Sequence, residues 1–388
     1  MTVLSSNAFR TIASLETLTK AHQKALIGKR SNRTATTSNY MFMSELLTIQ
    51  QELTTGTYTP LPYRKRLITE PKVRHIEAPA FRDRIVHHAL HSVLSPFYER
   101  HFIHDSYACR PDKGTHKAMR RVQQFLRTTP TMYVCKIDIS KYYGSVNHNK
   151  LRSLLAQRIT DPQLLHLLNV IIASSDSGTE YDYLFPPESH FHAKGRRGIP
   201  IGNLTSQLFA NIYLHAADMH AKHTLKIRHY IRYMDDILFF HPDKAQLRRW
   251  QDSLTAFLYD ELYLTVNPRK VRIYPAHLGV DFVGYILYPH TKRVRASSVR
   301  RFRRRFNKKL RSLTEGKVSV QSVNNSFNAW SAHVMHGNGE PLVARERAKK
   351  DDAIFVASIL KHYRRNMRRQ QKLEQLTLFD DHVDTDTP

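Results

Sequence analysis

Residues 231–240 read Ile-Arg-Tyr-Met-Asp-Asp-Ile-Leu-Phe-Phe, so two adjacent carboxylates, Asp235 and Asp236, lie between two short apolar and aromatic runs. Each run has the length of a buried strand, and the Met-Asp-Asp centre predicts a hairpin with both acids at its tip. Neighbouring anions repel each other, so the pattern favours a bound cation, and hard divalent cations such as Mg²⁺ take oxygen ligands. A solvated Asp-Asp turn accounts for the same pattern, because Asp is common in turns.

A third acid belongs with this pair. Residues 132–139 form an apolar run that predicts a buried strand, and Asp138 lies near its C-terminal end. A carboxylate in that place costs free energy unless it is paired or bound to a metal, so we expect Asp138 to meet Asp235 and Asp236. A helix N-cap or an ordinary salt bridge is the alternative for Asp138.

The charge balance points to a polyanionic partner. The 388 residues include 60 Lys+Arg against 33 Asp+Glu, a formal net charge of +27. Such a surplus repels itself in the folded state, which favours nucleic acid as a partner, with a membrane surface second. A mean hydropathy of -0.49 and the absence of a long apolar run argue against a membrane span. The N-terminus lacks a basic region followed by an apolar core, so we expect no signal peptide.

The cysteines and histidines do not indicate a disulfide framework or a zinc site. Cys109 and Cys135 are the only cysteines, which fits a reducing cytoplasm. His215, His220 and His223 lie near one another on a predicted helix, but no set of cysteines or carboxylates completes a site. We expect that helix surface to lie against nucleic acid.

Basic side chains in a predicted hairpin and a loop are candidates for binding phosphate. Residues 63–77 predict two strands joined by Glu-Pro-Lys, and Lys72 and Arg74 there suit phosphate oxygens. An ordinary exposed basic hairpin explains the same residues. Arg110 follows in a turn-rich stretch, where a loop could aim it inward.

Two further positions are singled out by their neighbours in the sequence. Gly202 precedes a helical pattern and permits close backbone approach to a ligand. Residues 262–270 predict a strand ending in a turn that presents Lys270.

Both ends of the chain differ in composition from its middle. Residues 1–57 predict polar helices, and from residue 291 helices are predicted from Ser297 or Ser298, over 320–336 and over 341–370. Their combined basic faces predict a track for a nucleic-acid backbone, although one such face alone would be an ordinary solvated surface. Residues 371–388 turn acidic, and we expect them to be disordered. Within them Gln-Leu-Thr-Leu-Phe at 375–379 either docks on the protein or is a linear motif for a partner.

Three ordered motifs resemble those of reverse transcriptases: Lys-Ile-Asp-Ile-Ser-Lys-Tyr-Tyr at 136–143, Ile-Gly-Asn-Leu-Thr-Ser-Gln at 201–207 and Tyr-Met-Asp-Asp at 233–236. The resemblance covers about residues 10–335. The second motif looks like reverse transcriptases of diversity-generating retroelements and related bacterial unknown-group enzymes of phage defence. Residues 107–116 and 328–333 support that branch.

This resemblance implies an α+β fold, the right-hand polymerase with fingers, a palm built on an antiparallel sheet, and a helical thumb. The implied domains are an N-terminal helical extension (1–57), fingers (58–118), palm (119–290, with finger helices at 149–172 and a loop at 174–198), thumb (291–370) and tail (371–388).

The resemblance also implies the chemistry. Asp138, Asp235 and Asp236, with the carbonyl of Ile139, would hold two Mg²⁺ ions about 3.5–4 Å apart, for which Mn²⁺ could substitute. Lys270 matches a lysine that protonates pyrophosphate. The other implied contacts are the triphosphate and nucleotide residues Lys72, Arg74, Arg110, Tyr143, Ile201, Gly202 and Gln207, the primer grip Gly284 and Tyr285, and the track Arg301, Arg304, Arg305 and Lys308. Tyr143 matches the bulky residue that excludes a ribose 2′-hydroxyl.

Two positions depart from the common reverse transcriptase pattern. Most members carry Gln where this chain has Ile201, and Pro where it has Gln207. Because an apolar Ile cannot donate the hydrogen bond that Gln makes near the incoming nucleotide, we expect weaker discrimination and low fidelity.

The expected function is an RNA-directed DNA polymerase in a bacterial cytoplasm. It would use dNTPs to copy a dedicated noncoding template RNA into cDNA and would hold the resulting RNA–DNA hybrid. We expect it to act within a diversity-generating retroelement, together with a small basic accessory protein. An antiphage enzyme with a second defence protein and an inactive RNA-binding scaffold remain alternatives. The tail residues Gln375, Leu376, Leu378 and Phe379 look like a sliding-clamp motif. No membrane partner is expected.

Overall fold

The structure, a computed structural model, describes residues 3, 4, 7–27, 42–69, 73–128, 131–176 and 195–380. The chain forms two compact units, Met1–Ala276 (unit 1) and His277–Pro388 (unit 2). Within the described residues no helix combines the length and the apolar character that crossing a bilayer requires.

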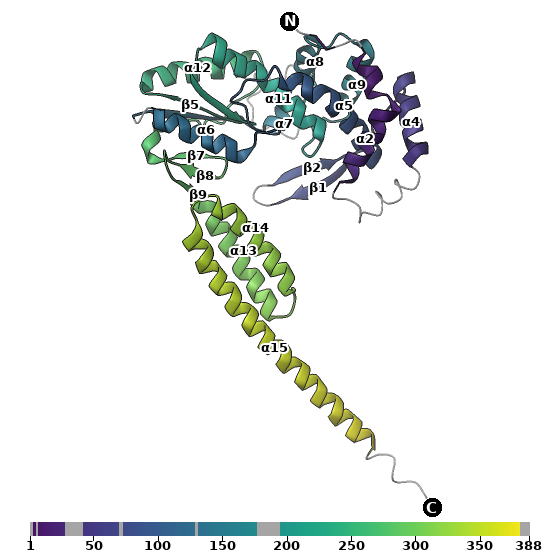
Figure 1. The fold of residues 1–388 in the computed structure, drawn as a ribbon, viewed down its shortest axis with the longest axis vertical. Coiled ribbons are helices and arrows are strands. Elements are labelled where there is room, and N and C mark those ends of the chain that lie inside the picture. The colour runs from purple at the N-terminus through teal and green to yellow at the C-terminus, as the bar shows by residue number, and fades with distance from the viewer. Residues whose placement is uncertain are drawn as a thin grey trace, which may run out of the picture. The chain divides into compact units, whose positions relative to one another are not determined.

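Unit 1 contains a four-stranded antiparallel sheet in the order β4-β5-β3-β6. Its strands are β3 (Tyr133–Asp138), β4 (His229–Tyr233), β5 (Asp236–His241) and β6 (Arg272–Pro275). Helices α6 (Thr115–Thr128) and α12 (Lys244–Asp260) lie on opposite sides of the sheet (Figure 1). Because both faces are covered, β5 is buried from Ile237 to Phe240. The hairpin predicted over 231–240 is confirmed as β4 and β5.

The helical part of unit 1 is organised around α5 (Phe81–Glu99), which is contacted by α1, α2, α4 and α11. The helices here are α1 (Ala8–Ile12), α2 (Leu15–Leu26), α4 (Phe42–Thr55), α7 (Tyr142–Ser145), α8 (His148–Ala156), α9 (Pro162–Ala173), α11 (Leu204–Met219) and the π-helix η2 (His220–Thr224). A continuous apolar core joins these helices to the sheet.

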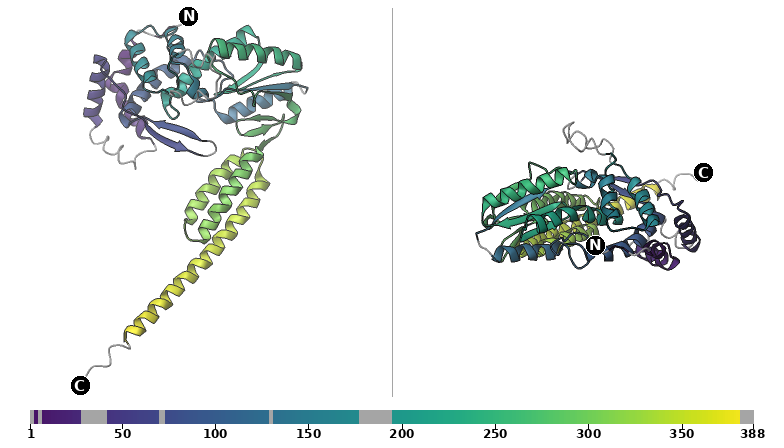
Figure 2. Two further views of the ribbon diagram at one scale, coloured as in Figure 1. Left: turned by 180° about the vertical axis from the view of Figure 1, so that it is seen from behind. Right: turned by 90° about the horizontal axis from the view of Figure 1, so that it is seen from above.

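A two-stranded hairpin, β1 (Arg64–Ile68) and β2 (Arg74–Ala78), projects from these helices as a separate ribbon (Figure 2, left). All of β1 is exposed. The predicted strands over 63–77 are therefore confirmed, whereas Lys72 lies outside the described residues, as does most of the predicted loop at 174–198.

Helix α5 contains Pro96 and continues to Glu99, because the buried Leu94 and Tyr98 hold its last turn against the core. Two predictions for unit 1 differ from the structure. The strand predicted over 262–270 is absent: only Val266 forms a bridge, to Ile139. His215 does not lie on a nucleic-acid surface. Its ring packs edge-on against Phe102 at 5.5 Å, and burial lowers its pKa to about 4.

Unit 2 combines a small antiparallel sheet with three long helices. The sheet has the order β7-β8-β9, and its elements follow the 3₁₀ turn η3 (Ala276–Leu278), which spans the boundary. The elements are β7 (Val280–Phe282), β8 (Tyr285–Leu287), β9 (Lys292–Val294), α13 (Ala296–Thr314), α14 (Val320–Met335) and α15 (Glu340–Asp380). Phe306, Val323, Phe327 and Val334 form the core of the helices.

The predicted boundaries of the C-terminal region change accordingly. Unit 2 begins at His277 and so contains the β7–β9 sheet as well as the helices predicted for the thumb from residue 291. Residues 280–287 form two strands joined by a tight turn at Val283 and Gly284, both with positive φ. Arg295, not Ser297 or Ser298, is the N-cap residue of α13. Helix α15 runs to Asp380, where a disordered tail was predicted from 371.

Candidate active site

Strand pairing brings two of the three predicted acids together. Strands β3 and β5 run antiparallel, and their register places Asp138 opposite Asp236. Asp235 precedes Asp236 in the turn between β4 and β5, where Met234 adopts a left-handed conformation with φ of 55°. Carboxylates from distant parts of the chain therefore meet at one edge of the sheet.

Two lysines neutralise part of this charge. The Nζ atom of Lys270 lies 2.5 Å from Oδ2 of Asp138, and Nζ of Lys136 lies 3.5 Å from Oδ1 of Asp236. The loop that carries Lys270 is anchored to the end of β3, because the backbone N–H of Asn267 donates to the carbonyl of Asp138 at 2.8 Å. Each lysine thus pairs with one of these two acids, and the third acid, Asp235, has the least compensated charge.

The local field reflects that arrangement. Burial, and then the neighbouring carboxylate of Asp236, raise the pKa of Asp235 to about 6, and Asp138 contributes in the same direction against the opposing ammonium of Lys270. Burial also raises the pKa of Asp236, although Lys136 opposes this effect. A bound cation would stabilise the ionised form of these carboxylates, which burial and mutual repulsion disfavour.

The donor chemistry fits a divalent cation, although the ligands are not preassembled. Over the described part of the chain, no three His, Cys, Asp or Glu side chains are arranged to hold a metal ion together. Asp138 and Asp236 instead contact Lys270 and Lys136. Three carboxylates at one sheet edge offer the hard oxygens that Mg²⁺ prefers. Metal binding would therefore exchange these lysine contacts for contacts with the ion.

Tyr143 lies beside the acidic turn. Its hydroxyl is 3.7 Å from the sulfur of Met234, and burial, followed by the nearby charges of Cys109 and Asp235, raises its pKa. Its backbone carbonyl accepts a 2.9 Å hydrogen bond from the N–H of Ile199. The ring therefore lies close to the acidic turn, and its contact with the nucleotide stays a prediction.

Arg110 does not have the role predicted for it. Its side chain is 4% exposed, and its guanidinium binds the carboxylate of Glu99, with Nη2 at 2.7 Å and Nε at 3.0 Å. The remaining nitrogen donates to the carbonyls of Ile103 and Ser106. Because all its nitrogens bind protein groups, the prediction that Arg110 holds a triphosphate is wrong for this structure.

Two of the other predicted nucleotide residues, Ile201 and Gly202, lie against β2 at Glu77 and Ile76, whereas Arg74 lies opposite Ile68 at the far end of the hairpin. Arg74 is exposed at the start of β2, and Ile201 and Gln207 are half-buried. The carbonyl of Ile201 accepts a 3.0 Å hydrogen bond from the N–H of Glu77. Gly202, with φ of 123°, approaches β2: a Cβ there would meet Cγ2 of Ile76 at 3.1 Å. The lack of a side chain at Gly202 therefore accommodates β2, and the close approach to a ligand stays a prediction.

Unit 2 carries the predicted primer grip and basic track. Tyr285 is 1% exposed, and its hydroxyl contacts Nδ1 and the carbonyl of His333 at 2.8 and 2.9 Å. Its side chain therefore packs inside unit 2, which leaves the backbone at Gly284 as the accessible part of the motif. The basic residues lie on α13, with Arg304, Arg305 and Lys308 exposed and Arg301 half-exposed. The tail residues Gln375, Leu376, Leu378 and Phe379 fall within the bounds of α15.

Sequence reasoning missed two residues of this region, Lys136 and Arg232. Arg232 is completely buried in β4 and pairs with Asp218 of α11. A signal was present, since an arginine inside a predicted buried strand needs an acidic partner. The sequence alone did not identify that partner.

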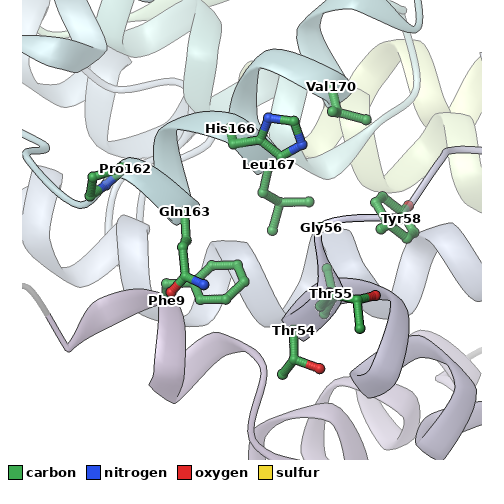
Figure 3. Close-up of a pocket in the computed structure, with 11 residues that line it drawn as sticks. Phe9, Thr54, Thr55, Gly56, Tyr58, Pro162, Gln163, His166, Leu167 and Val170 are labelled. Atoms are coloured by element: carbon green, nitrogen blue, oxygen red, sulfur yellow. The ribbon is translucent and has the colours of Figure 1, made fainter.

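A cavity of about 250 Å³ lies elsewhere in unit 1, between α1, the end of α4 and α9 (Figure 3). Phe9, Tyr58 and Leu167 line it, with His166 and Gln163 among its polar groups. The described residues that line it include no Asp, Glu, Lys or Arg, so it does not suit a triphosphate.

Comparisons with known proteins place this geometry in context. Protein YkfC of Escherichia coli (strain K12) is 29% identical over 282 residues, spanning 63% of this chain and 71% of YkfC. The group II intron-encoded protein LtrA of Lactococcus lactis subsp. cremoris is 28% identical over 173 residues, which are 44% of this chain and 27% of LtrA.

Two solved telomerase structures are also similar, each at 14% identity. The Candida albicans structure has a TM-score of 0.43 and covers 76% of this chain and 55% of its own. The apo telomerase structure of Candida tropicalis has a TM-score of 0.42 and covers 63% of this chain and 59% of its own. The chain thus spans little more than half of either telomerase and about a quarter of LtrA.

The family model described as "Reverse transcriptase (RNA-dependent DNA polymerase)" matches residues 64–287. These residues contain Asp138, Asp235, Asp236 and Lys270. The match and the antiparallel sheet with its covering helices confirm the predicted α+β fold of the right-hand polymerases. The chain therefore belongs to the reverse transcriptase family, whose members are RNA-dependent DNA polymerases.

Proposed function

We propose that this protein synthesises cDNA on a dedicated noncoding RNA template at the edge of the β3–β5 pair. The observation that carries the proposal is the register that sets Asp138 opposite Asp236, with Asp235 in the adjoining turn. Asp138, Asp235 and Asp236 would hold the metal ions. Bound Mg²⁺, or Mn²⁺ in its place, would supply Lewis-acid stabilisation at the primer 3′-hydroxyl and at the leaving pyrophosphate.

The surrounding side chains have defined tasks in this proposal. Tyr143 positions the deoxyribose and excludes a ribose 2′-hydroxyl. Lys270, held 2.5 Å from Asp138, donates a proton to the departing pyrophosphate once the ammonium is released from the carboxylate. Arg74 on the exposed hairpin contacts the triphosphate. In unit 2, the backbone at Gly284 contacts the primer, and the α13 residues Arg301, Arg304, Arg305 and Lys308 contact the nucleic-acid backbone.

Within this activity we propose low-fidelity copying of the kind used by diversity-generating retroelements. The support is Ile201, an apolar side chain whose backbone is tied to Glu77 beside the hairpin. Such a side chain offers no hydrogen bond to the nascent base pair. The cellular setting of the proposal is a bacterial cytoplasm with a small basic accessory protein, and the tail motif binds a sliding clamp.

The first test is primer extension. Purified protein should add dTMP to oligo(dT) on poly(rA) in the presence of Mg²⁺, and an Asp138→Asn variant should not. No incorporation by the wild-type protein with Mg²⁺ or Mn²⁺ on any primer would instead support an inactive RNA-binding scaffold.

The second test identifies the RNA. Nucleic acid that co-purifies with the protein from its host is sequenced, with the Asp138→Asn variant as a control for bound cDNA. A template repeat, with cDNA changed at adenines, supports the retroelement. Recovery of a structured RNA from a defence locus, together with a second defence protein, would overturn the retroelement proposal and support the antiphage function. Because LtrA is named for a group II intron, recovery of an intron RNA would also overturn the retroelement proposal.

A further inference from the structure

Arg232 is buried directly behind the acidic turn. Its side chain is 0% exposed, as is that of Asp218. The guanidinium grips Asp218 through Nε and Nη2, each at 2.7 Å, in the forked geometry that arginine forms with carboxylates. Tyr230 donates a further hydrogen bond to Asp218 at 2.8 Å. The pair is therefore fully satisfied inside the protein.

The remaining nitrogen of Arg232 reaches the turn itself. Its Nη1 lies 3.2 Å from the carbonyl oxygen of Met234 and 3.2 Å from Oδ1 of Asn211. Met234 adopts a φ of 55°, a left-handed conformation that costs free energy for a residue with a side chain. A buried donor on its carbonyl stabilises that conformation, and Met234 immediately precedes Asp235.

The arginine is fixed from two other directions. Asn211 and Asp218 lie seven positions apart on α11, hence on one face of that helix, and Nδ2 of Asn211 donates to the carbonyl of Ala108 at 2.9 Å. The backbone of Arg232 pairs with the loop at 105–107: its N–H donates to the carbonyl of Asp105, and its carbonyl accepts from the N–H of Tyr107. Strand β4 is therefore held along its outer edge as well.

We propose that Arg232 is a positioning residue that holds the Met234 turn so that Asp235 faces Asp138 and Asp236, with Asp218 and Asn211 fixing its guanidinium. The proposal rests on the proposed polymerase function of those acids. Groups that orient metal ligands without touching the metal commonly change metal affinity or activity by about 10–100-fold when they are removed.

The test separates positioning from folding. In the double variant Arg232→Met plus Asp218→Leu, apolar side chains replace the whole buried pair, a change that is often neutral for stability. The Met234 carbonyl nevertheless loses its donor. A second variant, Arg232→Lys, keeps a cation for Asp218 but lacks the planar fork needed to hold Asp218 and Met234 together.

The expected result for both variants is a kcat about tenfold or more below wild type, a KM for dTTP within about threefold, and a Kd for Mn²⁺, measured by calorimetry without nucleotide, raised about tenfold or more. The matched control is Tyr58→Phe plus Asp83→Asn, which disturbs a buried polar pair of unit 1 bonded at 2.9 Å on other elements. The control should lower the melting temperature without changing kcat or the Mn²⁺ affinity.

Several outcomes would overturn the proposal. One is wild-type kcat and Mn²⁺ affinity in a folded Arg232→Lys or double variant. Another is a loss of kcat and of Mn²⁺ affinity in the control variant alongside its lower melting temperature, because such a loss would indicate a general effect of destabilisation. If the wild-type protein incorporates no dNTP, the proposed function fails, whereas the Mn²⁺ calorimetry still tests the positioning by Arg232.

Discussion

Replacing Arg110 with methionine should destabilise unit 1 and leave dNTP binding unchanged. The substitution removes charge-assisted hydrogen bonds to Glu99 and the donors for the carbonyls of Ile103 and Ser106. A hydrogen bond to a charged group contributes about 1.5–3 kcal/mol, and breaking a buried ion pair costs about 3–5 kcal/mol. Glu99 is 28% exposed and would regain some hydration, so we expect the low end of that range, about 3 kcal/mol.

In a domain of this size, each kcal/mol lowers the melting temperature by about 2–4 °C. The Arg110→Met variant should therefore unfold about 6–12 °C below wild type, in a thermal scan followed by circular dichroism. At a temperature where both proteins are folded, its KM for dTTP should be unchanged.

Arg74→Met is the matched control, because Arg74 is exposed at the start of β2. This variant should keep the wild-type melting temperature and raise the KM for dTTP. An Arg110→Met variant with the wild-type melting temperature and a raised KM for dTTP would show that Arg110 leaves Glu99 to bind the triphosphate. That result would refute the structural role of Arg110.

Three further predictions concern fidelity, acid stability and backbone strain. Ile201→Gln should lower the frequency of errors opposite template adenine in sequenced cDNA, and an unchanged error spectrum would remove the fidelity proposal. Burial lowers the pKa of His87 to about 3 and that of His215 to about 4 from an ordinary 6.5. The unfolded chain therefore binds more protons below pH 6.5, so the urea midpoint should fall steadily from pH 6.5 to pH 4, and a flat midpoint would contradict this. Gly202→Ala should cost about 1–3 kcal/mol by urea denaturation, because φ is 123° and the new Cβ would meet Ile76 at 3.1 Å; a neutral substitution would show that the backbone there relaxes.

The hairpin and its acids were predictable because each element of the pattern has a local cause. Two apolar runs flanking Asp235 and Asp236 can hardly form anything but paired buried strands with a turn between them. The pairing of Asp138 with Asp236 followed from the energetic cost of a buried acid without a partner. The helices of unit 2 were located by their apolar periodicity.

The errors arose where the partner decides the role of a side chain. Arg110 has the residue type of a phosphate ligand, and only the fold shows that Glu99 already occupies it. Tyr285 lies in strand β8, within the predicted primer-grip motif, and only the fold shows that its hydroxyl contacts His333 in helix α14. Arg232 was overlooked because Asp218 and Met234 reach it only after α11 packs beside β4. A single sequence can indicate that a buried charge needs a partner, but for these residues it did not identify which distant residue that partner is.

Asp235 is the acid whose charge is least compensated, and we therefore expect the proposed catalysis to depend most on it. The direct measurement is Mg²⁺-dependent addition of dTMP to oligo(dT) on poly(rA) by the wild-type protein and by Asp235→Asn. The variant should fold at least as well as wild type, since the substitution removes a carboxylate that Asp236 and Asp138 repel. Incorporation should fall by about a hundredfold or more. An Asp235→Asn protein that extends the primer at the wild-type rate would contradict the central claim.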